Sequence, residues 1–297
     1  MDPAYLSEKK KVAEVLVESL PYIRRFAGRT IVIKYGGHAM VDENLKINFA
    51  KDMVLLKFIG INPVVVHGGG PQINEVMDRM GIKANFVDGM RRTDEETMAV
   101  VEMVLGGRVN KSIVSLLEGQ GGKAVGICGK DANLIQAKKM QIVHETLTGA
   151  PEIIDPGLVG EITRINTEII DTLVQKSFIP VIAPIGNGPN GESFNVNADL
   201  AASHIAQALD AARLILMTDV DGLLDENKEV IPEISADEAR VMIKDGRIFG
   251  GMIPKIEYAI KAVENGVGKA AIINGAKPHS IILELFTDLG IGTEVKI

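Results

Sequence analysis

Cysteine is almost absent from this chain of 297 residues, in which Cys128 is the only one. A single thiol cannot form an intrachain disulfide, and no cluster of cysteine and histidine has the spacing of a zinc finger. We therefore expect a protein of a reducing compartment without structural zinc. Cys128 is interpreted as a small core residue rather than a nucleophile.

Long apolar runs are absent too. No segment approaches the roughly 20 apolar residues that cross a bilayer, and the first residues, MDPAYLSEKKK, lack the apolar stretch of a signal peptide. The sequence predicts a cytoplasmic protein that binds no membrane. Basic residues are outnumbered as well: 32 Lys and Arg against 39 Asp and Glu give a net charge of −7, which disfavours nucleic acid as a partner.

Two common nucleotide-binding signatures are missing. No glycine cluster has the pattern Gly, four residues, Gly-Lys-Ser/Thr, and none has the spacing G-x-G-x-x-G with an acidic residue about 20 positions later. Both absences count against P-loop NTPases and dehydrogenases. The chain also lacks low-complexity segments and short-period repeats, which removes solenoids and disordered tails from consideration.

The chain does contain the alternation of strand and helix patterns that is typical of an α/β protein. Its 46% hydrophobic residues suffice for a sizeable core, in one large domain or in two lobes. Short β-branched runs alternate with helical patterns, which predicts a mainly parallel sheet covered by helices on both faces. Strands are expected at 30–34, 63–66, 123–128, 160–165, 179–183, 213–217 and 269–273. The turn-rich stretch 186–193 predicts a loop or hairpin, and we place a lobe boundary just before it.

An amphipathic helix is expected ahead of the first strand, from Ser7 to Gly28, with a kink at Pro21. Because it precedes the main fold, its apolar stripe is available to another subunit. The alternative is a helix that folds onto the chain's own core. Two further helix starts are predicted by capping boxes, Thr93 with Glu96 and Ser235 with Glu238. The apolar stripe consists of Val12, Val15, Leu16, Leu20, Ile23 and Phe26.

Glycine clusters follow two of the predicted strands, Gly36 and Gly37 after the first, and 68–70 after the second. Glycines let backbone N–H groups approach an anion closely, and Pro71 suits the first turn of a helix whose N-terminus adds positive charge. The pair of clusters predicts a phosphate or carboxylate cradle at the carboxyl ends of parallel strands. A pair of plain tight turns is the alternative.

Two lysines lie beside such glycines. Lys34 immediately precedes the first cluster, and Lys255 follows Gly250 and Gly251 in the first turn of a predicted helix. A cation in a helix's first turn is disfavoured by the helix dipole, so its place there favours an anionic partner. The alternative for Lys34 is a surface lysine that extends from a strand edge.

Polar side chains alternate along FNVNAD, where Asn195, Asn197 and Asp199 are spaced two apart. In an extended segment such residues point to the same side and can converge on one site. The alternative is that Asn197 or Asp199 only caps the following helix. Downstream, the strand ending LILMT is followed by Asp219, Asp221 and Gly222, which suit metal ligands, a nucleotide-binding loop or a plain turn.

Taken together and in this order, the motifs IKYGG, HGGGPQI, GMRRTD, FNVNAD, LMTDVDGLL and GGMIPK closely resemble the amino acid kinase family. Arg91 in GMRRTD, with NVNAD and the C-terminal LELFTDLGIGT, is most similar to the members that phosphorylate N-acetyl-L-glutamate. The resemblance implies a three-layer αβα sandwich with three parts. Residues 1–28 would be an oligomerisation helix, 29–183 a substrate-binding and dimerisation lobe, and 184–297 an ATP-binding lobe.

The resemblance also implies roles for the matched residues. Lys34 and Lys255 would stabilise the transferred phosphoryl group, and Asp199 would hold both lysines. The amino acid would be bound by Gly69, Gly70, Arg91, Asn195 and Asn197, and the nucleotide by Gly36, Gly37, Thr218, Asp219, Asp221 and Gly222. Mg²⁺ would be carried mainly by the ATP phosphates, with no metal site on the protein. A substrate carboxylate is ionised near pH 7, so this chemistry needs no general base.

Regulation and assembly are implied by the same resemblance. Family members with a kinked N-terminal helix are arginine-inhibited hexamers, trimers of dimers with interlaced helices. Glu284 and Gly290 match positions near the arginine site, whereas Ala271 replaces a frequent histidine and leaves the strength of inhibition open. His38 and Arg92 also depart from the commoner residues, which leaves substrate affinity open. A PII-type regulator is a further partner that the sequence leaves undecided.

Two other functions remain open at this point. One is a different member of the family, acting on an unacetylated amino acid or on carbamate. The other is a catalytically silent arginine sensor on the same fold, which the presence of Lys34, Asp199 and Lys255 disfavours.

Overall fold

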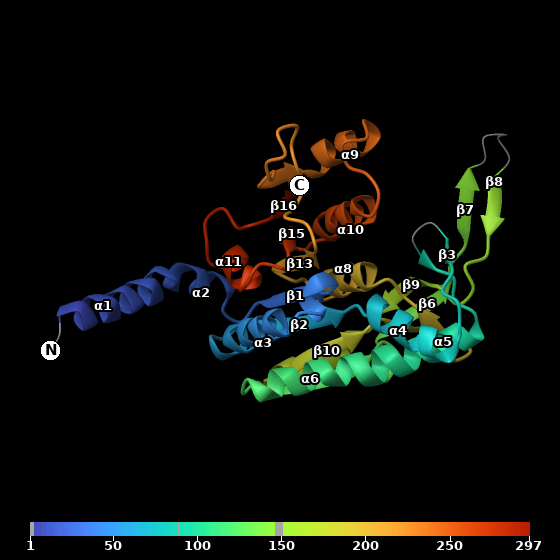
Figure 1. Ribbon diagram of the computed structural model, residues 1–297, viewed down its shortest axis with the longest axis horizontal. Coiled ribbons are helices and arrows are strands. Elements are labelled where there is room, and N and C mark those ends of the chain that lie inside the picture. Colours follow the sequence, from blue (N-terminus) through green and yellow to red (C-terminus); the bar gives the residue numbers. More distant parts are fainter. Residues whose placement is uncertain (1–2, 88–89, 146–150) are drawn as a thin grey trace.

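The structure, a computed structural model, describes residues 3–87, 90–145 and 151–297, and its centre is an eight-stranded sheet (Figure 1). Across the sheet the order is β14, β16, β15, β13, β1, β2, β10, β5. The strands are β1 (Thr30–Tyr35), β2 (Asn62–His67), β5 (Ala124–Cys128), β10 (Ile179–Ala183), β13 (Arg213–Thr218), β14 (Glu233–Ser235), β15 (Ala270–Asn274) and β16 (Thr293–Lys296). The pairs are parallel except β15 with β16, so the predicted mainly parallel sheet is confirmed.

Helices cover both faces of this sheet. Ile31 and Ile33 of β1 are buried in one apolar cluster, and Val32 between them is buried in the other, as alternation along a strand requires. The first face carries α3 (Glu43–Phe58), α4 (Gly70–Met80), α5 (Glu95–Val101), α6 (Asn110–Gly119) and α11 (Ser280–Leu285). The second carries α7 (Glu168–Gln175), α8 (Ala198–Ala208), α9 (Ala236–Lys244) and α10 (Met252–Glu264). The predicted three-layer αβα sandwich is confirmed.

A smaller sheet lies beside the main one and contains the predicted hairpin. Its order is β12 (Ser193–Asn195), β11 (Ile185–Asn187), β6 (Ile135–Lys139) and β9 (Gly160–Ile165), with β11 and β12 antiparallel. Two short ribbons complete the strands, β3 (Phe86–Val87) with β4 (Met90–Arg91), and β7 (Ile142–Glu145) with β8 (Pro151–Ile154). The β7 and β8 ribbon projects from the body of the molecule (Figure 1).

The N-terminal segment forms two helices, α1 (Pro3–Glu18) and α2 (Leu20–Phe26), which meet at Ser19. The kink predicted from Pro21 is therefore confirmed, because proline cannot donate to the preceding turn. The predicted start at Ser7 is wrong, since the helix already includes Pro3. In Figure 1 α1 extends away from the body, and the side chains of Val15 and Leu16 are 62% and 65% exposed.

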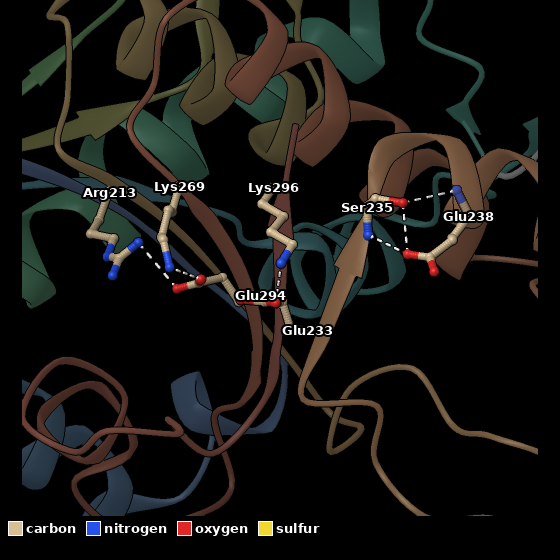
Figure 2. Close-up of polar contacts among 7 residues, drawn as sticks. All are labelled: Arg213, Glu233, Ser235, Glu238, Lys269, Glu294 and Lys296. Atoms are coloured by element: carbon tan, nitrogen blue, oxygen red, sulfur yellow. Dashed lines mark hydrogen bonds and ion pairs between the residues drawn. The ribbon is translucent and has the colours of Figure 1, made fainter.

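One of the two predicted capping boxes is confirmed. Ser235 Oγ accepts from the N–H of Glu238, and Glu238 Oε2 accepts in return from the N–H of Ser235 at 2.9 Å (Figure 2). The box at Thr93 is wrong, because Asp94 caps α5 by accepting from Thr97 N–H at 2.8 Å. A carboxylate at the N-cap also meets the positive end of the helix dipole, which favours it over a hydroxyl.

Between α5 and α6 the helix continues as a π-helical segment, η2 (Glu102–Val109), and a 3₁₀ turn, η1 (Gly37–Met40), follows β1. Such segments are uncommon and often lie at functional sites. Within the described ranges, we find no helix with both the length and the apolar character to span a membrane.

Candidate active site

At the carboxyl end of β1, adjacent side chains point to opposite faces of the sheet. Tyr35 lies on the α3 face, where its ring stacks on Phe49 with centroids 3.7 Å apart. Lys34 follows Val32 by two residues and therefore lies on the face covered by α8 and α10. Paired on both sides, with Val66 and Leu216, this strand end holds the lysine beside the first turns of those two helices.

Asp199 lies between the two predicted lysines. Lys255 Nζ donates to Asp199 Oδ2 at 2.8 Å, and Lys34 Nζ is 3.2 Å from Asp199 Oδ1. Asp199 is the second residue of α8, and Lys255 lies in the first turn of α10. The structure thus brings together three residues that are more than 50 positions apart in sequence. We call them the Asp199 cluster.

The extended conformation expected for Asp199 is wrong. Asn197 caps α8, its Oδ1 accepting from Asp199 N–H at 2.8 Å and from Leu200 N–H at 3.1 Å. This cap places Asp199 in helical geometry. The alternative of a capping role is therefore confirmed for Asn197, which also lines the cavity described below.

Charge pairing decides the electrostatics of the Asp199 cluster. Burial acts to raise the pKa of the Asp199 carboxyl, but the charges of Lys34 and Lys255 outweigh it and hold the pKa below its usual value. Burial lowers the pKa of the Lys34 ammonium, with the Asp199 carboxylate opposing that change. The carboxylate therefore stays ionised, and one carboxylate between two ammonium groups leaves the cluster cationic.

A cavity of about 300 Å³ opens beside this cluster. Nine of the predicted residues line it: Lys34, Gly36, Gly37, Gly69, Gly70, Arg91, Asn195, Asn197 and Asp199. Lys255 does not line the cavity itself, but it donates to Asp199, which does. The predicted catalytic and amino-acid-binding groups are thus brought to one place, whereas Thr218, Asp219, Asp221 and Gly222 do not line this cavity.

The glycine clusters are needed for close contacts. Gly37 has φ +68°, and a Cβ there would lie 2.4 Å from Asp219 Oδ1, the atom that accepts from His38 N–H. A Cβ on Gly69 would lie 2.5 Å from Leu105 Cδ2 of η2. A side chain at either position would press on the end of a neighbouring side chain, whereas a Cβ on Gly70 would meet nothing within 4 Å.

Arg91 is a second buried cation that lines the cavity. Its guanidinium donates to Asn74 Oδ1 at 2.6 Å and lies 4.9 Å from the ring centroid of Phe86. Burial lowers its pKa, and no carboxylate among the described residues forms an ion pair with it. Asn195 is held nearby through Thr93 Oγ1 at 3.2 Å. A buried guanidinium of this kind suits a carboxylate ligand.

The predicted nucleotide residues gather on the loop after β13. Asp221 pairs with Lys277 at 2.7 Å and accepts from Asn274 at 2.9 Å, and the Lys277 hydrogen bond lowers its pKa. Gly222 has φ +142°, and a Cβ there would lie 2.5 Å from Thr293 Oγ1. Among the residues that the structure describes there is no group of three or more His, Cys, Asp and Glu that could hold a metal ion.

The two predicted regulatory residues are adjacent. Glu284 Oε2 accepts from Ile291 N–H at 2.9 Å, and Gly290, at φ +65°, leaves no room for a Cβ beside that carboxylate. Burial raises the pKa of Glu284. Ala271 lies buried on β15.

Sequence reasoning missed several residues that line the cavity, among them Gln72, Leu105, Met140 and Tyr258. Tyr258 follows Lys255 by three positions on one helix, a spacing that places both on the same face. Gln72 belongs to the HGGGPQI motif, and its Oε1 is buried without a partner in the described structure. Leu105 and Met140 carry no comparable signal.

Comparisons with known proteins agree with this geometry. The family model described as the amino acid kinase family matches residues 29–274. Acetylglutamate kinases from Stutzerimonas stutzeri strain A1501 and Syntrophobacter fumaroxidans strain DSM 10017 are each 56% identical over 95% of this chain and 94% and 95% of their own. N-acetylglutamate synthase from Neisseria gonorrhoeae, complexed with coenzyme A and N-acetyl-glutamate, aligns with a TM-score of 0.82 at 26% identity. That alignment covers 96% of this chain but 63% of the synthase. The chain belongs to the amino acid kinase family.

Proposed function

We propose that this enzyme transfers the γ-phosphoryl group of ATP to the side-chain carboxylate of N-acetyl-L-glutamate. The product is N-acetyl-L-glutamyl 5-phosphate, an intermediate of arginine biosynthesis. The observation that carries the proposal is a cavity lined by two buried cations, Lys34 of the Asp199 cluster and Arg91. Asp199 is the one carboxylate among its described lining residues, and it is already paired. The 56% identity with two acetylglutamate kinases supports the choice of substrate.

The chemistry requires charge stabilisation rather than proton removal. A substrate carboxylate has a pKa of about 4.3 and is already a nucleophile at neutral pH. The difficulty is to bring this anion against the γ-phosphate, and two lysines with backbone N–H donors neutralise and position the transferred group. Asp199 keeps both lysines in place. Since it is ionised and paired, it is unsuited to act as a base.

We assign the cavity, together with the loop after β13, to the two substrates. Arg91 would bind the α-carboxylate, Asn195 and Asn197 the neighbouring polar groups, and Gly69 and Gly70 the reacting end. The nucleotide would lie along Gly36, Gly37 and the loop 218–222. Most of the N-acetylglutamate site would then belong to residues 29–183, and most of the ATP site to 184–297. Bound Mg²⁺ would supply further charge neutralisation. It would be held mainly by the ATP phosphates, because Asp219 and Asp221 are already engaged by protein donors.

An acyl phosphate assay tests the reaction directly. Purified protein, ATP and Mg²⁺ are incubated with hydroxylamine and with N-acetylglutamate, glutamate or aspartate as the acceptor, and hydroxamate is measured. For carbamate, ADP release is measured instead. We expect hydroxamate with N-acetylglutamate alone. Product with another acceptor would identify a different family member, and no product with any acceptor would favour the silent arginine sensor.

The exposed N-terminal helices support an assembly proposal. Four side chains of the predicted apolar stripe face solvent in the isolated chain, Val12, Val15, Leu16 and Leu20, whereas Phe26 is buried in the chain's own core. We assign this stripe to interlacing between dimers in a cytoplasmic hexamer, a trimer of dimers. Light scattering before and after deletion of residues 1–26 should show the mass falling to that of a dimer. An unchanged mass would contradict interlacing.

Arginine is the proposed effector at Glu284 and Gly290. Activity is measured with rising arginine in the wild type and in Glu284→Ala, which removes the buried carboxylate while leaving the cavity intact. We expect inhibition of the wild type and weaker inhibition of the variant. Full activity of the wild type at saturating arginine would remove this proposal, and a PII-type regulator would then be the next partner to test.

A further inference from the structure

His67 ends β2 immediately before the glycine cluster, and it has no exposed surface. Its Nδ1 lies 2.8 Å from the carbonyl oxygen of Gly68, and its Nε2 lies 3.2 Å from Asn110 Nδ2. A carbonyl oxygen can only accept, so Nδ1 carries the proton and donates it to Gly68. That leaves Nε2 as the acceptor for the Asn110 amide.

Asn110 is itself held from two sides. It is fully buried at the start of α6, and its Nδ2 also contacts Val181 O at 2.9 Å and Ile127 O at 3.2 Å, so its two hydrogens are shared among three acceptors. Those carbonyls belong to β10 and β5, the strands beyond β2 in the sheet. Two carbonyl acceptors fix which end of the amide faces the imidazole. His67 is therefore fixed by the sheet and by α6 together.

This imidazole holds one particular peptide group. Gly68 N–H donates to Tyr35 O at 2.8 Å, and Gly68 O accepts from His67. The described backbone has no cis peptide bond, and in a trans peptide the C=O and the following N–H point in opposite directions. The N–H of Gly69 therefore points away from His67. It donates to no residue that the structure describes, and Gly69 lines the cavity.

We propose that His67 and Asn110 are positioning residues that aim the Gly69 N–H at an oxygen of the transferring phosphoryl group. The proposal deepens the proposed kinase function and rests on it. Leu105 of η2 packs on Gly69 from the same continuous helix that carries Asn110, so that helix fixes the loop by packing and by hydrogen bonding. His67 does not serve as a base, because both ring nitrogens are engaged within the core.

Two substitutions at one position separate positioning from packing. The amide of His67→Asn reaches the place of Nδ1 and can still donate to Gly68, whereas that of His67→Gln reaches the place of Nε2 and cannot. Removing an oxyanion donor lowers kcat by about 10²-fold or more, so misdirecting one should cost between about 10-fold and 10²-fold. We expect that loss in His67→Gln, with KM for N-acetylglutamate nearly unchanged, and kcat within about 3-fold of wild type in His67→Asn.

Melting temperatures are recorded for both variants, since each leaves space in the core. If both variants lost kcat equally, in proportion to the fall in melting temperature, the proposal would be overturned. His67 would then be a core residue only.

A measurement on the intact wild type covers the case in which a variant fails to fold. ¹⁵N-labelled histidine distinguishes a protonated from an unprotonated ring nitrogen by NMR, and the spectrum of either folded variant, or of Asn110→Ser, assigns His67. We expect a proton on Nδ1 and none on Nε2. A proton on Nε2 would overturn the proposal. Because this readout needs no turnover, a wild type that makes no hydroxamate would reject the kinase function while the tautomer still tests the geometry.

Discussion

Among the residues that the structure describes, two largely buried carboxylates each lie between two cations, but only one of them lines the site cavity. Asp199 lies between the two site lysines, and Glu294 of β16 lies between Arg213 at 3.1 Å and Lys269 (Figure 2). Both carboxylate side chains are largely buried, at 10% and 16% exposure. The sets of charges are alike, so charge alone does not make a site.

The difference lies in which end of the strands carries the charges. Lys34 is next to last on β1, whereas Arg213 is the first residue of the parallel strand β13. At the carboxyl end, glycine loops and the first turns of α8 and α10 surround the carboxylate and leave space for a ligand. At the amino end, the same charges join β13, β15 and β16 and stabilise the edge of the sheet.

The largest expected effect is at the Asp199 cluster. Lys34→Ala and Lys255→Ala should each lower kcat by about 10² to 10³, or about 3 to 4 kcal/mol, because each would remove a proposed donor to the transferred phosphoryl group. The assay is hydroxamate formation at saturating substrates. Lys269→Ala is the matched control at Glu294 and should retain kcat within about 2-fold. Near-wild-type turnover in either site variant would remove the catalytic assignment.

A buried carboxylate whose one partner is an imidazole extends the comparison to the pH dependence of stability. Asp52 of α3 lies 2.6 Å from His279 Nδ1, and burial raises its pKa to about 6 despite that partner. The folded state therefore binds the Asp52 proton more tightly than the unfolded state, so this contribution to stability is present below about pH 4 and is lost as the pH rises to about 6. The loss is on the order of 3 kcal/mol.

Asp52→Asn cannot ionise and should abolish this contribution. Urea unfolding of both proteins at pH 4 and pH 7 should show that the variant gains stability relative to wild type as the pH rises. The difference between the two proteins isolates Asp52 from the other carboxylates. A difference that does not change with pH would show that the Asp52 pKa is not raised.

A smaller effect is expected at Glu294. Glu294→Ala leaves Arg213 largely buried without its carboxylate, which should destabilise the fold by about 2 kcal/mol, between the values for buried and exposed pairs. Thermal unfolding measures the loss, and kcat should stay within about 2-fold of wild type. Glu233→Ala breaks the half-exposed pair with Lys296 on the same edge and should shift the melting temperature less. The reverse order would contradict the role of burial.

The smallest effect concerns the capping box in Figure 2. Ser235→Ala removes the side-chain acceptor at the start of α9 and should cost about 1 kcal/mol in urea unfolding, with turnover unchanged. Ser235→Asp restores an acceptor and should recover most of the loss. If both variants were equally unstable, the cap would not be the cause.

Much of this site was predictable because its chemistry is local in sequence. Lys34 and Gly36 flank one strand end, and Lys255 stands in a helix's first turn, so residue type and position already pointed to an anion. The predicted strands could be located because parallel strands buried on both faces are continuous apolar runs. Residue spacing alone could not predict that Lys34 converges with Asp199 and Lys255. That expectation came from the order of the motifs, which resembles the amino acid kinase family.

The wrong predictions concern positions where contacts in the folded structure decide which residue caps a helix or pairs in a strand. Thr93 and Asp94 are both good caps one residue apart, and Thr93 instead donates to Arg91 O. Asp199 was expected in an extended segment because the alternation of polar residues is visible in the sequence. In the structure the cap at Asn197 starts α8 at Ala198, so Asp199 is already helical. Short strands such as β6 and β7 are defined by their partners rather than by their own composition. The role of His67 depends on Asn110, 43 positions away.

The position of β1 in the sheet also sets the order in which the protein can be completed during synthesis. Its partner β2 is made soon afterwards, but its other partner, β13, begins at Arg213, about 180 residues after β1 ends at Tyr35. At about 5 to 20 residues per second, a ribosome takes roughly 10 to 35 seconds to reach it. During that interval one edge of β1 lacks its partner on the nascent chain, and an unpaired strand edge of this kind can pair with another chain.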